Sequence, residues 1–534
     1  MSDERSLQTL IRMHQNRQIS RRTFMQRCAA LGIAAPFASI LATPGVSLAS
    51  SNQNAMLRPG LAQQSVELTI GQVEEPDTLD PHNLTAAAAG LLGYVAMPGL
   101  VWWDYDLGIS PMIAESWESS EDGLTWTFNL RPNLVFHNGK PCTAQEVVRN
   151  FEHIMDPEGG SFLAPDYVSV ASVEAPDETT VVFTLSEPFA PFLAILTNRC
   201  AITDMDAYDD TTPVGTGPFK IVEWNRGTGV VLEAHDQYWE EGLPLASRVD
   251  WNFYPNSDSR VLALQAGDID IVYSVPPEQV DLLMQEDTVL VEPIPGVTHD
   301  YIAFNCASGP FSDVRMRKAV AHAIDKELVV EGAEWGFAHA TNIPFPPTSP
   351  WYIEIPDYEY DPERAQALMA EAGYADGLEL DMPVAATTPL PEIAELIQPD
   401  LAAIGINVRL VETEWATYWP EIYLKGQFDI TPMGYSARVD PDQTFYPRYR
   451  TGGIHNPMGY SNARMDELLD QGRIITDFDE RKAIYDEVQT ILVDELPWLW
   501  LYLPDVRMGW RNNITGFQQH PAAHFYVTTS TKEG

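Results

Sequence analysis

Helical and strand patterns alternate along the second half of the chain, and this alternation limits the possible folds more than any other feature. Asp313 opens a helical pattern that continues through Val330. A further helical pattern spans Ile393–Ile404, although it contains Pro399, and Asn407–Val411 then alternates as a strand does. Strands separated by helices predict βαβ units and a largely parallel or mixed sheet.

The first half has a different pattern, in which strand pairs are accompanied by fewer helices. Thr125–Leu130 and Thr179–Leu185 alternate as strands. Between them, Thr143–Glu146 has the form of a capping box that starts a helix running toward Met155. A chain of 534 residues is too long for one hydrophobic core. We therefore expect an α/β protein with two unlike lobes.

Residues 1–49 have the layout of a cleaved secretory signal. A charged region is followed by an apolar stretch at 28–42, which is shorter than the ~20 residues that span a bilayer. Small residues then allow cleavage after Ala49. Paired arginines followed by phenylalanine, within 20–25, resemble a twin-arginine signal. We predict export to the periplasm, with residues 50–64 as a flexible leader; the alternative is an uncleaved membrane anchor.

The chain is strongly acidic. Its formal net charge is −44, and removal of residues 1–49, which carry six Arg and two acidic residues, makes it −48. A surface of this charge repels phosphate backbones, so we expect no nucleic-acid partner. The total does not reveal the charge of a ligand, because the field inside a pocket differs from the field of the whole protein.

Three cysteines remain after the predicted cleavage: Cys142, Cys200 and Cys306. They allow at most one disulfide within the chain, and whether any two of them pair stays open. A framework of disulfides is therefore excluded.

The sequence contains no recognisable catalytic motif. Gly215–Lys220 has a glycine pair but lacks the third glycine of a phosphate-binding loop. The histidine pair His520 and His524 has no acidic residue beside it, which argues against zinc. The acidic pairs at 209–210 and 240–241 lie in hydrophilic surroundings, where two carboxyl pKa values are not driven apart. We expect neither an enzyme, nor a cofactor, nor a bound metal.

A series of segments from residue 66 onward resembles one family, the peptide/nickel/opine-type (family 5) extracellular solute-binding proteins of ABC transporters. The similarity extends to the dipeptide- and oligopeptide-binding members. The segments follow the family's order and cover nearly the whole mature chain. They are Glu75–Pro81, Pro111–Trp117, Thr125–Arg131, Phe136–Pro141, Pro213–Lys220, Phe304–Asn305, Asp313–Asp325, Tyr360–Glu363 and Glu371–Tyr374.

The resemblance implies a two-lobe periplasmic-binding-protein fold of the class II type, with an extra subdomain in the first lobe. A ligand that touches both lobes only when they are closed stabilises the closed form. The implied divisions are lobe I at 65–298 plus 500–534, the extra subdomain at about 90–210, lobe II at 299–499, and crossings near Tyr301–Phe304 and Trp500–Leu503.

The resemblance also implies the function and the partners. The protein is expected to capture a peptide-like or modified small molecule between its lobes and to deliver it to the permease subunits of an ABC importer in the membrane. We expect it to act as a monomer.

Arg438 is the main candidate for ligand binding. In peptide-binding relatives an Asp at the matching position clamps the ligand's amine, and Tyr435 replaces a usual Trp. An always-charged Arg prefers carboxylate or phosphate, so the substitution predicts an anionic group on the ligand. In the alternative, Arg438 turns away and pairs with Asp440 or Asp442. Residues 383–389 also lack the Arg that binds a dipeptide's carboxylate in relatives, so an ordinary free dipeptide is disfavoured.

The resemblance suggests further site residues. Asp440 belongs to the same segment as Arg438, and Trp415 matches a Trp of dipeptide-binding relatives at the start of a predicted helix, Trp415–Leu424. Arg199 and His455 lie where nickel-chelate-binding relatives offer a pocket Arg and a metal-ligating His. For Arg199, Trp415 and His455 the alternatives are a surface Arg, a core aromatic and a solvent-exposed His.

Two other functions therefore compete with a receptor for anionic peptide-like molecules. One is a metal-chelate receptor of the nickel type, with His455 and Arg199 at its site. The other is a secreted hydrolase, which the absence of a nucleophile–base pair disfavours.

Overall fold

The computed structural model of the chain describes residues 66–83, 93–197, 200–209, 211–436, 438 and 440–533. The predicted signal segment, the predicted leader and Arg199 lie outside these residues. Ser65–Gly534 forms one unit, and the fold below is that of this unit.

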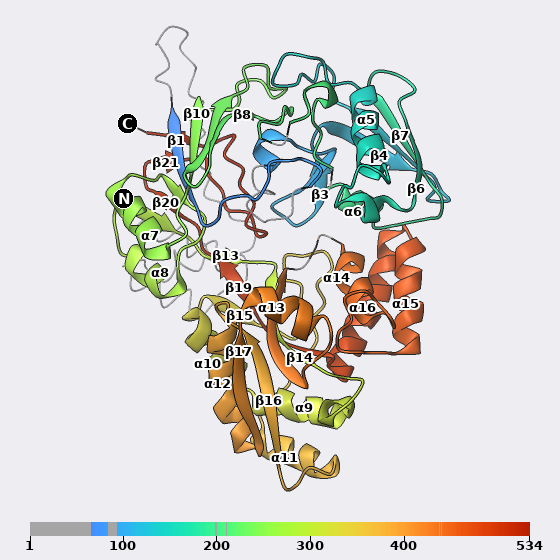
Figure 1. The fold of residues 1–534 in the computed structure, drawn as a ribbon, viewed down its shortest axis with the longest axis vertical. Helices are drawn as coiled ribbons and strands as arrows, with labels where there is room; N and C mark the ends of the chain where they lie inside the picture. Colours follow the sequence, from blue (N-terminus) through green and yellow to red (C-terminus); the bar gives the residue numbers. More distant parts are fainter. Residues whose placement is uncertain are drawn as a thin grey trace, which may run out of the picture. The chain divides into compact units, whose positions relative to one another are not determined.

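A seven-stranded mixed sheet joins strands from the two ends of this unit (Figure 1). Its order is β12-β20-β11-β1-β10-β9-β8, in which β1 runs parallel to β10 and β11 and the other pairs are antiparallel. The strands are β1 (Glu67–Gln72), β8 (Phe219–Asn225), β9 (Gly229–Ala234), β10 (Arg248–Phe253), β11 (Ile271–Val272), β12 (Val289–Val291) and β20 (Gly509–Arg511), and helices α7 (Ser257–Ala266) and α8 (Pro277–Leu283) lie between β10 and β12 in the chain.

A separate four-stranded antiparallel sheet, β4-β5-β7-β6, is formed by residues 114–185. Buried and less buried side chains alternate along β5 and β7, as expected for strands with one face in a core. Helix α5 buries Val147, Phe151 and Ile154 in this core. The elements are β4 (Ala114–Ser119), β5 (Thr125–Leu130), α5 (Ala144–Met155), η1 (Ala164–Tyr167), β6 (Val170–Glu174), β7 (Thr180–Leu185), α6 (Phe192–Ile195) and η2 (Met205–Ala207).

The second half is built on a five-stranded sheet, β13-β19-β14-β18 with β15 on β19, and on the parallel pair β16–β17. Its strands are β13 (Ile294–Pro295), β14 (Thr298–Phe304), β15 (Ala338–Ala340), β16 (Leu378–Ala385), β17 (Ile406–Thr413), β18 (Ile430–Ser436) and β19 (Trp498–Val506). Its helices are η3 (Pro310–Ser312), α9 (Val314–Ala323), α10 (Lys326–Glu334), α11 (Pro362–Glu371), α12 (Leu390–Ala403), α13 (Trp415–Thr417), η4 (Tyr418–Tyr423), α14 (Pro441–Tyr449), α15 (Ala463–Ile474) and α16 (Phe478–Glu495).

The small pairs β2–β3 and β21–β22 complete the described strands. They are β2 (Val101–Trp103), β3 (Ile109–Pro111), β21 (Ile514–Thr515) and β22 (Thr531–Lys532).

Two neighbouring segments connect the seven-stranded sheet with the second half. Residues 292–297 lead from β12 through β13 to β14, and residues 507–508 lead from β19 to β20. The short strand β13 pairs with the end of β19, so the two connections lie side by side (Figure 1). The segments at 301–304 and 500–503 lie within β14 and β19, which pair with each other antiparallel.

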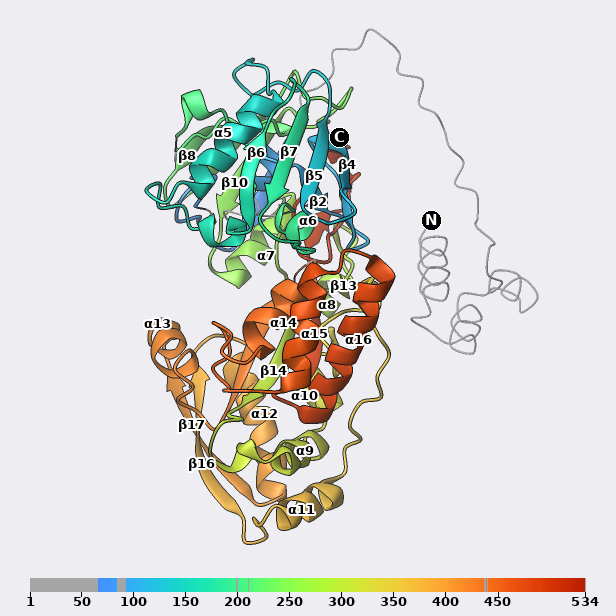
Figure 2. The same cartoon turned by 90° about the vertical axis from the view of Figure 1, so that its right-hand side faces the viewer.

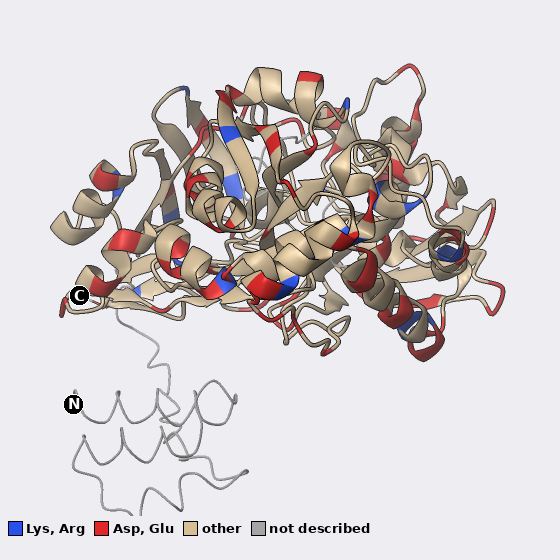
Figure 3. Ribbon diagram, turned by 90° about the horizontal axis from the view of Figure 1, so that it is seen from below, with Lys and Arg blue, Asp and Glu red and all other residues tan. Residues whose placement is uncertain are grey.

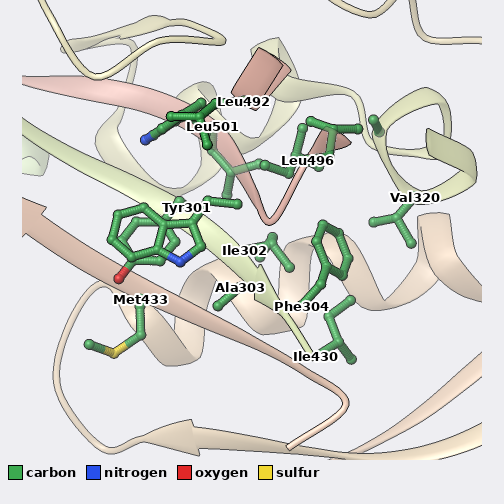
Figure 4. Close-up of a cluster of buried hydrophobic side chains, with 14 of the residues drawn as sticks. Tyr301, Ile302, Ala303, Phe304, Val320, Ile430, Met433, Leu492, Leu496 and Leu501 are labelled. Atoms are coloured by element: carbon green, nitrogen blue, oxygen red, sulfur yellow. The ribbon is translucent and has the colours of Figure 1, made fainter. Parts of the chain in front are cut away.

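The core of the second half is aromatic at its centre. Tyr301 stacks on Trp498 with ring centroids 3.8 Å apart. Figure 4 shows this region, with Tyr301, Ile302 and Phe304 of β14 and Leu501 of the paired strand β19 in the same buried cluster. Burial of these apolar side chains contributes several kcal/mol to the packing of β14 and β19.

One predicted helix is wrong in its extent. The pattern through Val330 forms two helices, α9 and α10, with a break at Ile324–Asp325. The Asp325 side chain accepts a hydrogen bond from the Leu328 N–H and so caps the second helix. Such a capping residue starts a new helix and ends the one before it. The spacing of apolar residues continues across the break, so the sequence pattern does not reveal it.

The exterior of the chain carries many more acidic than basic residues in the view of Figure 3. No described helix is both long enough and apolar enough to cross a membrane. Cys142, Cys200 and Cys306 are free thiols, and burial raises the pKa of Cys306 to about 11.

Candidate functional site

A cavity of about 800 Å³ lies between residues 165–195 on one side and residues 415–455 on the other. This volume is in the range of small-molecule sites. The two sides of the cavity are also joined through Arg473: its carbonyl accepts a hydrogen bond of 2.7 Å from the Ala190 N–H, and its guanidinium carbon lies 4.9 Å from the centre of the Phe189 ring. In Figure 2, α6, which begins two residues after Ala190, faces α14 and α15, and Arg473 belongs to α15.

Strand β18 brings the chain to the floor of the cavity, where Met433, Gly434 and Tyr435 line it. A Cβ atom at position 434 would lie 2.6 Å from Oδ1 of Asp300 on the paired strand, so a larger residue there would require the buried Asp300 carboxylate to move. The close pairing of β14 and β18 therefore fixes where Tyr435 and the following loop enter the cavity.

Arg438 follows β18 and lines the cavity. Its backbone N–H donates to the Thr444 hydroxyl at 3.2 Å, and its Nε donates to the Tyr435 hydroxyl at 3.3 Å. The ion pairs of the described residues do not include Arg438, so it is not paired with Asp440 or Asp442. Its guanidinium lies beside the cavity and forms no ion pair with a carboxylate of the described residues, although the more distant charge of Asp166 contributes to the rise of its pKa.

Arg448 is a second cavity-lining guanidinium of the same kind, and it is only 8% exposed. Its Nη1 donates to the carbonyls of Gln443 and Thr444, both at 3.0 Å. The carbonyl of Gln443 needs this donor because Pro447, four residues on, has no N–H. Like Arg438, Arg448 takes part in none of the ion pairs of the described residues.

Tyr435 lies between the two guanidiniums. The Arg448 guanidinium carbon is 3.6 Å from the centre of the Tyr435 ring, and that of Arg438 is 5.8 Å from it. Burial alone would raise the pKa of the Tyr435 hydroxyl, but the charges of Arg448 and Arg438 outweigh burial and lower it. The floor of the cavity is therefore a region of concentrated positive charge.

Two more arginines line the cavity, but carboxylates accompany both. Arg450 forms a double hydrogen bond with Asp470, at 2.8 and 3.1 Å. Arg473 Nε lies 3.5 Å from the carboxylate of Asp442, whose pKa burial raises to about 7. The cavity lining thus holds four Arg against three acidic residues, the other two being Asp166 and Glu187, in a chain with 32 basic and 76 acidic residues.

Asp440 does not line the cavity. It is buried, caps α14 by accepting from the Asp442 N–H, and forms a bidentate ion pair with the buried Arg481. Arg481 also donates to the Gly472 carbonyl at 2.6 Å. The Asp440 side chain therefore anchors α14, and with it Arg448, to the helices behind the cavity.

A row of aromatic rings forms part of the second wall, the one built from residues 415–455. Trp415, Trp419 and Tyr423 all line the cavity. Tyr418, on the same turns, is buried and bonds Thr431 instead. The predicted helix Trp415–Leu424 consists of a short α-helical turn followed by a π-helix at Tyr418–Tyr423.

His455 lines the cavity, and its Nδ1 is buried with no hydrogen-bond partner among the described residues. Burial lowers its pKa, and the charge of Arg448 lowers it further, so the ring is neutral near pH 7. The structure thus brings together four predicted site residues, Arg438, Tyr435, Trp415 and His455, and places Asp440 behind them.

Comparison with known proteins decides the family. The family model described as bacterial extracellular solute-binding proteins, family 5 Middle, matches residues 108–456. The chain belongs to this family. Heme-binding protein A of Haemophilus influenzae is 34% identical over 431 residues, which cover 73% of this chain and 78% of the relative.

Other relatives are similar to this chain over a larger share of its length. Glutathione-binding protein GsiB of Pectobacterium atrosepticum is 27% identical, and the aligned residues cover 84% of this chain and 90% of the relative. The solved structure of the PBP AgaA of A. tumefaciens R10, in complex with agropinic acid, is 28% identical, with a TM-score of 0.73, and covers 88% of this chain and 99% of its own.

These findings confirm the predicted family and the two-lobe periplasmic-binding-protein fold. This family 5 protein is the substrate-binding component of an ABC importer. Family members are transport proteins rather than enzymes, are periplasmic or extracellular, and work with the permeases of ABC importers.

Sequence reasoning missed Arg448, Arg473, Trp419 and Tyr423. A signal for the first was present, because residues 438–450 hold three arginines in a chain with few basic residues. The other residues have no such signal, since Arg473 reaches the cavity from α15 and the aromatic rings depend on an irregular helix.

Proposed function

We propose that this receptor captures a small peptide-like molecule bearing carboxylates, which Arg438 and Arg448 bind. One observation carries the proposal: two guanidiniums line one cavity, and neither forms an ion pair with a carboxylate of the described residues. A buried charge without a partner costs several kcal/mol, and a ligand anion offsets that cost. Bidentate hydrogen bonds between guanidinium and carboxylate would add specificity.

The relatives indicate what kind of carboxylate-bearing molecule the ligand is. Several of them are glutathione-binding proteins, and glutathione is a tripeptide with two carboxylates and one amine. A molecule of this size suits a cavity of about 800 Å³. Glutathione is therefore the representative ligand of the proposed class.

The proposal includes the route and the organisation of the protein. Residues 1–49 act as a twin-arginine-type signal that is cleaved on export to the periplasm. The mature chain is a monomer without enzymatic activity, with lobe I at 65–298 plus 500–534, an extra subdomain at about 90–210, and lobe II at 299–499. Closure of the lobes brings residues 165–195 and 415–455 together around the ligand.

Isothermal titration calorimetry with glutathione and its diethyl ester tests the ligand class. The ester keeps the peptide but masks both carboxylates. We expect glutathione to bind and the ester to bind at least tenfold more weakly. Equal affinities would contradict the proposal, because the arginines would then not be recognising the negative charge of the ligand.

Two Arg variants locate the charge. Arg438→Gln is expected to weaken glutathione binding by about 2–4 kcal/mol, the range for truncating a buried, hydrogen-bonded charge pair. Arg450→Gln is the matched control, since Asp470 already neutralises this cavity-lining Arg. Equal losses in both variants would show a general effect of net charge instead of a site at Arg438.

A metal-chelate receptor is the second candidate, and His455 favours it. The neutral His455 ring lines the cavity, and a neutral imidazole can ligate a metal held by an anionic chelate. Titration with heme and with nickel–histidine complexes tests this function. Binding that His455→Phe removes would support it, whereas binding of glutathione alone would contradict it.

A further inference from the structure

Four aromatic rings form a continuous stack along the cavity wall. The centroids of Trp415 and Trp419 are 5.5 Å apart, those of Trp419 and Tyr423 are 5.2 Å apart, and those of Tyr423 and Phe428 are 5.7 Å apart. The angles between successive ring planes are 17°, 15° and 11°. Offset, nearly parallel rings at these separations attract one another.

The backbone explains the stack. Trp415, Trp419 and Tyr423 are spaced four residues apart, and on an α-helix of 3.6 residues per turn such side chains are offset by ~40° at each step. Pro420 has no N–H and cannot complete an α-helical turn. The chain widens into a π-helix instead, in which the Leu424 N–H donates to the Trp419 carbonyl at 3.0 Å. Trp415, Trp419 and Tyr423 keep nearly parallel ring planes along this irregular turn, and π-helical turns are frequent at functional sites.

The stack runs from the core to the open cavity. Phe428 and Tyr423 are buried, Trp419 is half-buried, and Trp415 is 44% exposed. Core packing accounts for the inner rings, but it does not account for an indole left open at the end of the row. Two strongly exposed apolar side chains, Val168 (82%) and Ile454 (84%), line the same cavity from its two walls.

The stack and the arginines belong to one site. The hydroxyl of Tyr423 lies 2.8 Å from that of Tyr301, which lines the cavity floor. Burial raises the pKa of Tyr423 to about 12, and the charge of Arg448 opposes this rise, so the base of the stack lies within the electrostatic reach of the guanidinium. A ligand bound through carboxylates at the floor can extend along the rings.

We infer that the ligand carries, besides its carboxylates, a flat aromatic group that packs against Trp415 and Trp419. The carboxylate part of this inference rests on the proposed function, and the aromatic part rests on the stack alone. The ligand class is thus an anionic peptide with an aryl substituent, and a receptor for such conjugates would return them to the cell through the importer.

Three glutathione derivatives test the inference by titration calorimetry. Glutathione has no apolar substituent, S-hexylglutathione has a flexible one, and S-(2,4-dinitrophenyl)glutathione has a flat aromatic one. We expect the dinitrophenyl conjugate to bind roughly two- to tenfold more tightly than the hexyl conjugate, the range for ring stacking beyond apolar burial. It should also quench tryptophan fluorescence.

Variants assign the effect to the stack. Trp415→Leu is expected to abolish the preference for the dinitrophenyl conjugate over the hexyl conjugate, so the readout is the ratio of their two affinities in one variant. Trp335→Leu, at an exposed Trp that does not line the cavity, is the matched control and should retain the preference. Arg438→Gln should weaken the binding of all three compounds by the same factor.

Equal binding of the hexyl and dinitrophenyl conjugates would overturn the aromatic inference and leave the proposed function standing. A preference that survives Trp415→Leu would also overturn it. Binding of none of the three compounds would overturn the proposed function, and this inference with it.

Discussion

Asp442 gives the cavity a charge that depends on pH. Its carboxyl is buried, its Oδ1 has no hydrogen bond among the described residues, and it lies 3.5 Å from Arg473 Nε. Burial raises its pKa to about 7, although the Arg473 charge opposes this rise. Below pH 7 the group is neutral and Arg473 acts on the ligand undiminished; above pH 7 the carboxylate cancels that charge. Affinity for an anionic ligand is therefore expected to fall as pH rises through 7.

The size of the fall follows from Coulomb's law. A ligand carboxylate on the far side of Arg473 would lie ~7 Å from Asp442, which gives ~2 kcal/mol of repulsion at an effective dielectric constant of about 20. Salt screening reduces this to ~1–2 kcal/mol. The expected change in Kd between pH 6 and pH 8 is therefore roughly five- to thirtyfold.

Calorimetry with glutathione from pH 5.5 to 8.0 measures this change, because both carboxylates of glutathione stay ionised over this range. Burial lowers the pKa of His455, and the variant His455→Phe, which cannot titrate, removes any contribution of this ring to the measured change. Asp442→Asn should bind at all pH values as tightly as the wild type does at low pH. If the affinity of the wild type stays flat or rises with pH, or if Asp442→Asn keeps the same pH dependence of affinity, then ionisation of Asp442 does not control ligand binding.

Three predictions concern stability. Arg481→Met leaves Asp440 as a buried, unpaired carboxylate and should lower the free energy of unfolding by about 3–5 kcal/mol in urea titrations; an unchanged midpoint would contradict the anchoring role. Asp300 has its pKa raised to about 8 by burial and by the charge of Glu334, so its stabilising contribution is complete below its unfolded pKa and is lost as pH rises to 8. Asp300→Asn should therefore melt at a higher temperature than the wild type at pH 8.5, with a smaller gain at pH 5; a gain independent of pH would argue against this ionisation. Gly434→Ala places a Cβ atom 2.6 Å from Asp300 and should cost about 1–3 kcal/mol, measured by the same urea titrations, while Gly108→Ala, whose Cβ atom would meet its nearest neighbour at 3.4 Å, is the comparison for glycine substitutions.

Local patterns in the sequence predicted most of the regular elements. The helix that starts after Thr143 and ends at Met155 lies where the capping pattern placed it, although the Thr143 side chain makes no cap hydrogen bond. Helix α12 contains Pro399, as predicted. The break at Asp325 was missed because periodicity continues across it, and only the hydrogen bond to Leu328 reveals the new helix start.

The site was predicted in part. Arg438 and Tyr435 could be found because a family position had changed its charge, but the role of Asp440 depended on a partner 41 residues away, Arg481. Arg448 and the aromatic stack depend on two irregular helices, each with an internal proline, whose side-chain directions periodicity does not give. Residues that reach a cavity from such elements can be assigned only once the backbone is known.

The mass of the ligand that co-purifies with the protein is the sharpest test of whether this receptor binds a carboxylate-bearing molecule through Arg438. Native mass spectrometry of the wild type, followed by release and fragmentation of the bound molecule, is expected to find one small compound that contains carboxylates. Arg438→Gln should be purified largely free of it, and Arg450→Gln should retain it. A bound compound that is neutral or cationic, or one that Arg438→Gln retains in full, would contradict the account.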